Sequence, residues 1–334
     1  MVCAVATLMA TMFGSAQAGP ISIAMVTVGD PGNPADTQIM SDGTTGYGAV
    51  DYVYQIGKYD VTTAQYASFL NAVAATDLYH LYDISMPHDF PNNPSTVGIS
   101  RTGNSGSHSY TVIGNGNAPV FDVTWGNAAR FSNWLQNGQP TGSEGAGTTE
   151  TGTYTLNGAT STAALMAVTR NPGATWVLPA ENEWYKAAYY RGGGLNAGYW
   201  LYATQNNGMP SYLLSATGTN NMNFYNNGYT DPTNYLTSVG AFAASPGPYG
   251  TFDQGGNVFQ WNETAVTGVG RGLRGGSYFD TLFSNELNSS FRFFGDPTVQ
   301  RSNDFGFRVA SVPEPFSITL VVVGAIGLLI WRRR

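Results

Sequence analysis

The stretch YGTFDQGGNVFQW, residues 249–261, concentrates the features that decide the fold. It places a turn-forming aspartate, Asp253, two residues before the pair Gly255–Gly256. Paired glycines permit backbone angles that residues with side chains do not tolerate. Phe259 and Trp261 then alternate with a glutamine, which predicts a half-buried strand after a tight turn. The Asp253 side chain and neighbouring carbonyls also offer oxygen ligands of the kind a hard cation prefers, so either a plain turn or a cation site fits this stretch.

The composition indicates a loop-rich protein with a neutral polar surface. Only 10% of the 334 residues are charged, 42 are glycine, and the formal net charge is −7. This balance favours an extracytoplasmic protein over a helical cytosolic one. No cluster of Lys or Arg occurs before the last three residues, so the chain lacks the electrostatic footprint of a nucleic-acid-binding protein. The acidic balance is compatible with a cation site.

The cysteine content excludes several chemistries. The single cysteine is Cys3, inside the predicted leader, so the mature chain should contain none. Disulfides, thiolate metal sites and cysteine nucleophiles are therefore not expected. The three histidines, His80, His88 and His108, are too few for a histidine-rich metal site, and we expect His80 and His88, which lie in a loop-like stretch, to cap turns.

The two ends of the chain carry targeting patterns. Residues 1–18 are small and apolar and end in Ala16-Gln17-Ala18, the pattern that signal peptidase cleaves, although a basic first region is missing. At residues 312–334, a Pro-Glu-Pro motif precedes an apolar run, Phe316 to Trp331, and three terminal arginines. This order resembles the bacterial PEP-CTERM sorting signal. The resemblance implies a transmembrane helix with its basic terminus inside, which an exosortase removes on the way to the cell surface or matrix; a plain tail anchor is the alternative.

One domain, residues 19–311, lies between these ends, and its first half alternates short elements with loops. Thr62 and Gln65 form a capping box that predicts a helix with a single apolar face. The predicted elements are strands at 21–28 and 51–59, the helix after Thr62 with Tyr66, Phe69, Leu70 and Val73 facing inward, mostly loop over 76–118, a strand over 119–125, and a helix over 126–136.

The second half is predicted to hold even less regular structure. Residues 138–153 should be an exposed low-complexity excursion. Pro179 is placed to start a third helix over 180–190, where Glu181 and Glu183 favour the positive end of the helix dipole. Residues 191–249 should be dominated by loops, and ordered loops of this length are usually functional or held by a metal.

Six stretches resemble the formylglycine-generating enzyme (sulfatase-modifying factor) family. They occur in the family's order across residues 50–311 and read YQIGKYDVTTAQYASFLNA, PVFDVTWGNAARFSNWL, WVLPAENEWYKAAYY, YGTFDQGGNVFQW, LRGGSY and NDFGFRVA. The resemblance implies one compact α/β (α+β) domain of the sulfatase-modifying-factor fold, loop-rich and distantly C-type-lectin-like.

The resemblance also implies calcium at two sites built from oxygen ligands, which suit this ion. One site would use the side chains of Asn223 and Asp231 with the carbonyls of Phe224 and Thr233. The other would use the side chain of Asp253 with the carbonyls of Gln254, Gly256 and Val258. A metal-free turn is the alternative at each place.

Copper, in contrast, is not expected. Family oxidases hold copper through a cysteine pair after a GGS-aromatic turn, and they use it with oxygen to convert a substrate cysteine to formylglycine. Ser277 and Tyr278 match that turn, but Asp280 and, roughly, Asn285 stand where the cysteines would be. Neither side chain offers the soft thiolate that selects Cu(I). Ser277 is then a groove-lining hydroxyl or a structural turn residue.

These observations predict a calcium-stabilised surface or matrix module that binds a peptide or a glycan. The residues expected to wall the binding groove are Phe259, Trp261, Ser277, Tyr278 and Arg292. A competing hypothesis is an oxidase or protein-modifying enzyme in which Asp280 works with a hard metal. A third is a structural matrix component without a small ligand.

Overall fold

The computed structural model describes residues 19–87, 96–193, 197–266, 268, 270–281, 285–299 and 304–313. The predicted leader at 1–18, His88 and the apolar run from Phe316 to Trp331 lie outside these residues. Within the described ranges, no helix is long and apolar enough to cross a membrane.

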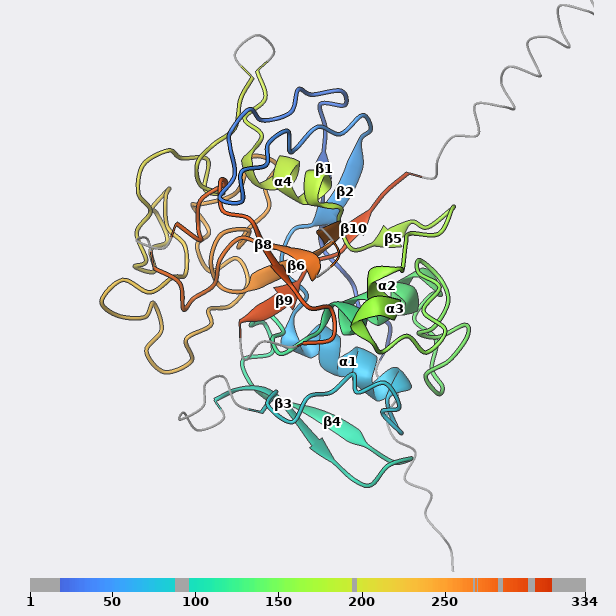
Figure 1. Cartoon of the computed structure of the whole chain (residues 1–334). Helices are drawn as coiled ribbons and strands as arrows, with labels where there is room; N and C mark the ends of the chain where they lie inside the picture. The colour runs from blue at the N-terminus through green and yellow to red at the C-terminus, as the bar shows by residue number, and fades with distance from the viewer. Residues whose placement is uncertain are drawn as a thin grey trace, which may run out of the picture.

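The described residues form two four-stranded sheets and a hairpin (Figure 1). The first sheet is antiparallel and has the order β1-β2-β10-β5, with strands Met25–Val28, Tyr54–Gly57, Ala310–Ser311 and Trp176–Val177. The second has the order β8-β7-β6-β9, with strands Phe293–Gly295, Gly270–Arg274, Phe259–Val266 and Phe305–Phe307; β6 and β9 are parallel. The hairpin pairs β3, Val97–Thr102, with β4, Ser109–Gly114.

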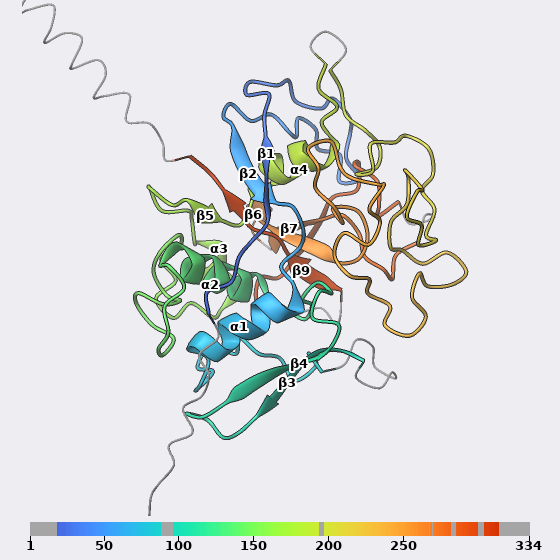
Figure 2. The same cartoon turned by 180° about the vertical axis from the view of Figure 1, so that it is seen from behind.

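Helices α1, α2 and α3 and the long loops before β6 occupy opposite sides of the molecule, and α4 lies near β1 and β2. The helices are α1, Thr63–Val73; α2, Trp125–Gln136; α3, Thr162–Met166; and α4, Glu181–Tyr189. In both Figure 1 and Figure 2, α1, α2 and α3 gather on one side, and the yellow and orange loops between α4 and β6 fill the other. The prediction of one compact, loop-rich α/β (α+β) domain is confirmed, and its regular structure is mostly sheet with few helices.

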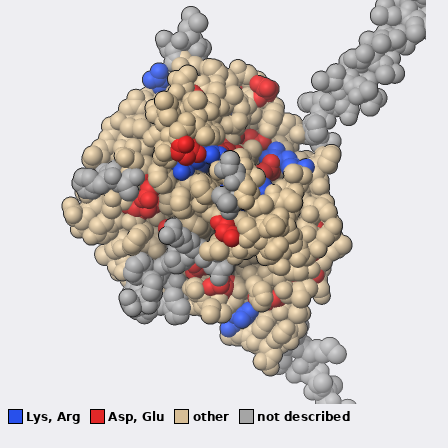
Figure 3. Space-filling model, in the orientation of Figure 1, with Lys and Arg blue, Asp and Glu red and all other residues tan. Residues whose placement is uncertain are grey.

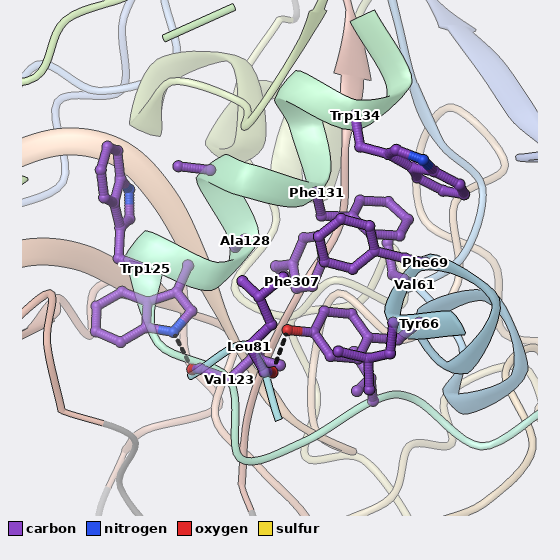
Figure 4. Close-up of a cluster of buried hydrophobic side chains, with 14 of the residues drawn as sticks. Val61, Tyr66, Phe69, Leu81, Val123, Trp125, Ala128, Phe131, Trp134 and Phe307 are labelled. Carbon is purple, nitrogen blue, oxygen red and sulfur yellow. Dashed lines mark hydrogen bonds between the residues drawn. The ribbon is translucent and has the colours of Figure 1, made fainter. Parts of the chain in front are cut away.

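Aromatic side chains fasten α1 and α2 to the second sheet. Phe131 of α2 lies between Phe69 of α1 and Phe307 of β9, with ring centroids 5.3 Å from each. Tyr66 packs in the same cluster and donates its hydroxyl to the Leu81 carbonyl at 2.8 Å (Figure 4). All four side chains are buried, so this cluster forms the main core.

The predicted start of α1 is confirmed by its capping box. Thr62 Oγ1 accepts a hydrogen bond from Gln65 N at 3.2 Å, and Gln65 Oε1 accepts one from Thr62 N at 2.9 Å. The two bonds satisfy donors that a helix otherwise leaves free at its first turn. The predicted strands at 21–28 and 51–59 are confirmed in part, as β1 and β2.

The prediction of mostly loop over 76–118 is wrong for the hairpin β3–β4. Its strands contain Gly and Ser, which weaken the local signal. Tertiary contacts hold the hairpin in place of a local signal. Asn71 of α1 donates to the Tyr110 carbonyl at 2.7 Å and accepts from the Tyr110 N–H at 2.9 Å. The Tyr110 hydroxyl also donates to the Ala74 carbonyl.

Three further boundaries differ from prediction. Residues 119–125 form only an isolated bridge between Pro119 and Thr62, because Thr124 caps α2 and Trp125 already belongs to that helix. Pro179 precedes the N-cap of α4 rather than lying in its first turn. The excursion at 138–153 is not wholly exposed, since Glu150 is buried and bonded to Arg130 at 2.7 Å.

The prediction of a half-buried β6 also needs correction. Gln260 is fully buried, although it alternates with two rings. Its Oε1 accepts hydrogen bonds from Trp184 Nε1 at 2.7 Å and from Arg308 Nε at 2.6 Å. The first half of the strand, residues 259–262, is thus covered on both faces, and the polar side chain of Gln260 is held by polar partners inside the protein.

We predict that Gly256→Ala destabilises the domain much more than Gly255→Ala. Gly256 has φ +75°, and an added Cβ would lie 2.1 Å from the Asn223 carbonyl oxygen. We expect a loss of about 2 kcal/mol or more in the free energy of unfolding. At Gly255 the nearest atom is the flexible Met222 Cε at 3.1 Å, and we expect less than about 1 kcal/mol. Urea unfolding of the two variants measures this difference, and equal midpoints would contradict it.

Candidate functional site

The glycine-rich loop before β6 is tightly curled and anchored to a neighbouring loop. Asp253, Gly256 and Asn257 all have positive φ, at 58°, 75° and 64°. Asn257 N donates to the Asn223 carbonyl at 2.9 Å, and the Asn257 side-chain oxygen accepts from Asn223 Nδ2 at 3.0 Å. The loop therefore has one defined conformation, held by backbone and amide bonds.

The predicted calcium site at Asp253 has groups suited to a hard cation. In the described part of the chain, no group donates a hydrogen bond to the carbonyl oxygens of Gln254, Gly256 or Val258. Asp253 Oδ2 accepts from the Gly240 N–H at 2.6 Å, and removal from water raises the pKa of Asp253 to about 6. A cation there would offset the cost of keeping this carboxylate ionised. Carboxylate and carbonyl oxygens are the kinds of ligand that calcium takes in proteins.

A small cavity lies beside the same loop. It measures about 10 Å³ and touches Asp253, Gln254 and Gly255. That volume admits about one water-sized species. Among the described residues, the buried Gln254 Oε1 has no hydrogen-bond partner, so this part of the loop leaves a polar oxygen unsatisfied.

The predicted calcium site at Asn223 fits less well. Asn223 Oδ1 is buried without a hydrogen-bond partner among the described residues, as a ligand oxygen would be. The Asp231 carboxylate, however, is engaged by its own turn, where it accepts from Thr233 N, Asn234 N and Asn234 Nδ2. The Thr233 carbonyl accepts from Thr96 Oγ1 at 3.3 Å. Phe224 is fully buried on the same loop.

Carboxyl groups surround Ser277 where the family places copper-binding sulfur. Asp280 Oδ2 accepts from both Ser277 N, at 2.7 Å, and Ser277 Oγ, at 3.0 Å, and Asp304 Oδ2 lies 3.3 Å from the same Oγ. Burial raises the pKa of Asp280, and a shared hydrogen bond with Glu286 raises it further. Ser277 is fully buried, so its hydroxyl is held in the turn.

Asn285, the second position matched to a cysteine, shares no side-chain hydrogen bond with Ser277 or Asp280 among the described residues. It is exposed, has φ +61°, and accepts from Asn288 Nδ2 at 3.2 Å. Across the described ranges, no three His, Cys, Asp or Glu side chains are arranged to hold a metal ion.

Most of the predicted groove residues lie inside the protein. Phe259, Trp261 and Tyr278 are at most 4% exposed, and Trp261 Nε1 donates to the Val123 carbonyl at 2.9 Å. Arg292 is bound through two hydrogen bonds to Glu181, each of 2.8 Å. A further bond of 2.7 Å joins it to Asp42. These side chains therefore do not form the wall of an open groove in this structure.

A buried arginine network lies beside the glycine-rich loop, and the pairing of Arg308 with Asp60 in it was not predicted. Arg308 Nη2 donates to Asp60 Oδ1 at 2.9 Å, and neither side chain is exposed. Burial raises the pKa of Asp60 to about 8, the Asp253 charge raises it too, and Arg308 opposes both effects. The aspartate after strand β2 and the arginine after β9 are both visible in the sequence, but their pairing depends on the fold.

Comparison with known proteins identifies the family. The model of the sulfatase-modifying factor enzyme 1-like domain matches residues 48–312, and the chain belongs to this family. No curated protein sequence matches. Among similar solved structures, CarF is 20% identical to this chain. The match covers 87% of this chain and 99% of that chain, with a TM-score of 0.48. Variable protein 1 of Treponema denticola has 18% identity, coverage of 88% and 96%, and a TM-score of 0.48. PvdO from Pseudomonas aeruginosa is 17% identical; the match covers 87% of this chain and 92% of that chain, with a TM-score of 0.46.

We predict that Asp60→Asn flattens the pH dependence of stability. The folded pKa of Asp60, about 8, exceeds its ordinary value of 3.8. As pH rises between these values, the unfolded chain releases a proton that the folded chain keeps, so the free energy of unfolding falls. The variant cannot release that proton. Urea unfolding at about pH 5 and about pH 8 should show a smaller decrease for the variant than for the unmodified chain.

The other acids with raised pKa, including Asp253 and Asp280, remain in both proteins, so their contribution cancels in this comparison. Parallel pH curves for the two proteins would show that Asp60 ionises normally in the folded state.

Proposed function

We propose that this chain is a calcium-stabilised binding module of the cell surface or extracellular matrix that recognises a peptide or a glycan. The observation that carries the proposal is the donor set at the family's copper position. Asp280 and Asn285 replace the two cysteines, and the sequence contains no cysteine beyond Cys3. Without a cysteine pair at these positions, the chain lacks the thiolates through which the family's oxidases hold copper. The fold remains, and with it the oxygen-lined loop around Asp253.

The ends of the chain support a surface location. Signal peptidase would remove residues 1–18, and the apolar run near the C-terminus would hold an inner-membrane intermediate until an exosortase cleaves it. The mature domain would then reach the cell surface or matrix. Charged side chains are sparse on the face shown in Figure 3.

The first test is the response of thermal stability to calcium. Adding calcium at about 100 times its Kd should stabilise the full chain by about 2.7 kcal/mol, which raises Tm by a few degrees. Asp253→Asn keeps an oxygen that can accept the Gly240 N–H but lowers the charge, so this variant should lose most of the increment. Asp231→Asn, the matched change in the other loop, should lose less because that carboxylate already serves its own turn.

Magnesium serves as the control cation, because it demands octahedral geometry and keeps several of its waters. An equal calcium increment in the Asp253→Asn variant would place the ion elsewhere. No increment in the unmodified chain would remove calcium from the proposal.

The competing function is an enzyme of the same family that works without cysteine. The observation that favours it is the pair of carboxyl groups at Ser277, from Asp280 and Asp304, with Glu286 bonded to Asp280. We expect no aldehyde when the full chain is incubated with cysteine-containing peptides, oxygen and either copper or iron. Mass spectrometry after aldehyde trapping measures the product. A trapped aldehyde that disappears in Asp280→Ala would establish the enzyme and overturn the binding module.

A further inference from the structure

The long loop between α4 and β6 holds three large apolar side chains in solvent. Met209 is 70% exposed, and Leu213 and Leu214 are each 58% exposed. A single exposed apolar side chain is common on protein surfaces, whereas a group of them marks an interaction site. We refer to Met209, Leu213 and Leu214 as the apolar tip.

Side-chain amides hold the backbone of the apolar tip in one place. Asn220 Nδ2 donates to the Met209 carbonyl at 3.1 Å, and Asn221 Nδ2 donates to the Leu213 carbonyl at 2.7 Å. Ser211, midway between Met209 and Leu213, pairs with Asn221 in an isolated bridge. Because Asn220 and Asn221 are consecutive, both ends of the apolar tip are fastened to the same short segment.

The base of the apolar tip is anchored to neighbouring parts of the long loop. Asn221 N donates to Ser245 Oγ at 2.9 Å, and Ser245 Oγ donates to the Gly218 carbonyl at 2.7 Å. The Tyr212 carbonyl accepts from Thr230 Oγ1 at 2.6 Å. To cover its leucines, the loop would have to break these bonds. The apolar tip is therefore ordered before a partner arrives, which lowers the entropy that binding costs.

The sequence around the apolar tip is free of charge. Between Arg191 and Asp231 it contains no Asp, Glu, Lys or Arg, and this is the longest charge-free stretch of the chain. The whole chain has a formal net charge of −7, so two copies repel each other at a distance. A contact through the apolar tip places no charged residue of this stretch against the partner. Depletion of charge, with Met and aromatic residues present, is typical of the centre of a protein–protein interface.

The loops that carry the apolar tip lie away from the end of the described chain. In Figures 1 and 2, the yellow loops between α4 and β6 and the end of β10 are on opposite sides of the molecule. The apolar run of the proposed membrane intermediate starts at Phe316, a few residues after β10. A bilayer that holds this run would lie on the far side of the domain from the apolar tip. This position favours a protein partner over a lipid surface.

We propose that the apolar tip is a self-association surface, through which two copies of this chain meet about a two-fold axis. A two-fold contact brings the same residues together from both copies, so the patch must be complementary to itself. An uncharged apolar patch meets this condition, and it is where two copies of like net charge can approach at the lowest electrostatic cost. The inference goes beyond the proposed function, because it depends neither on calcium nor on a ligand.

Sedimentation velocity of the full chain tests this surface, with one copy held in each phosphatidylcholine nanodisc. The loaded discs should form dimers as their concentration rises. Leu213→Asp with Leu214→Asp adds like charges on both sides of the contact and should raise the dimer Kd about 100-fold. Leu78→Asp with Ile84→Asp, a matched change at leucine and isoleucine side chains that are 57% and 76% exposed in the loop after α1, should leave Kd unchanged. Leu213→Ser with Leu214→Ser, which adds no charge, should raise Kd about tenfold.

Salt separates this contact from one built on ion pairs. Raising NaCl from about 50 mM to about 500 mM should strengthen the dimer, because salt screens the repulsion between the two copies.

Three results would overturn the inference: discs that stay monomeric at every concentration, a Kd that is unchanged in both Leu213 and Leu214 double variants, or a dimer that salt weakens. Loaded discs that bind empty discs, and lose this binding in the same variants, would assign the apolar tip to a lipid surface instead. The calcium response of Tm is measured separately, so the failure of either proposal leaves the other standing.

Discussion

The buried guanidinium group of Arg308 is the interaction on which the rest of the structure depends. It donates to Gly57 O at the end of β2, Asp60 Oδ1 before α1, Phe252 O in the glycine-rich loop and Gln260 Oε1 in β6. These groups come from both sheets and from the loop that carries Asp253. Arginine alone offers five donors in one rigid plane, so one side chain can satisfy several segments at once. A loop-rich domain with few helices needs such anchors, because its segments cannot satisfy their own backbone groups.

The predictable parts of the fold were those with a local physical signal. Thr62 and Gln65 predict the start of α1, because a capping box is formed by residues three positions apart. The apolar face of α1 follows the helical period. The strand predicted over 119–125 failed for the opposite reason. Its β-branched and aromatic residues favour a strand, yet the cap at Thr124 and the burial of Trp125 in α2 decide the conformation. The hairpin β3–β4 escaped prediction because Asn71 and Tyr110, far apart in sequence, hold it.

The candidate site was predictable only as a set of positions. The motif around Asp253 places carbonyls and a carboxylate in sequence, and the positive φ angles at Asp253, Gly256 and Asn257 agree with the predicted tight turn. Exposure was not predictable, because an alternating strand has the same pattern whether one face or both are covered. Gln260 shows this directly: it is a polar residue on β6 and still fully buried, since Trp184 and Arg308 provide its partners. Phe259 and Trp261, the rings on either side of Gln260, were expected to wall a groove. They are core residues, because other segments cover this part of β6.

The way the turn at Ser277 is held explains how family chemistry can change while the fold persists. Backbone bonds fix this turn: Gly256 N donates to Gly275 O, Tyr278 N donates to Asn257 O, and Asn257 N donates to Asn223 O. None of these bonds involves the side chain at position 280. A carboxylate there satisfies Ser277 N and Oγ and keeps the turn closed without sulfur. In this chain the turn at Ser277 is therefore held closed by backbone bonds and a carboxylate, and the conformation of the neighbouring loop at Asp253 does not depend on sulfur ligands.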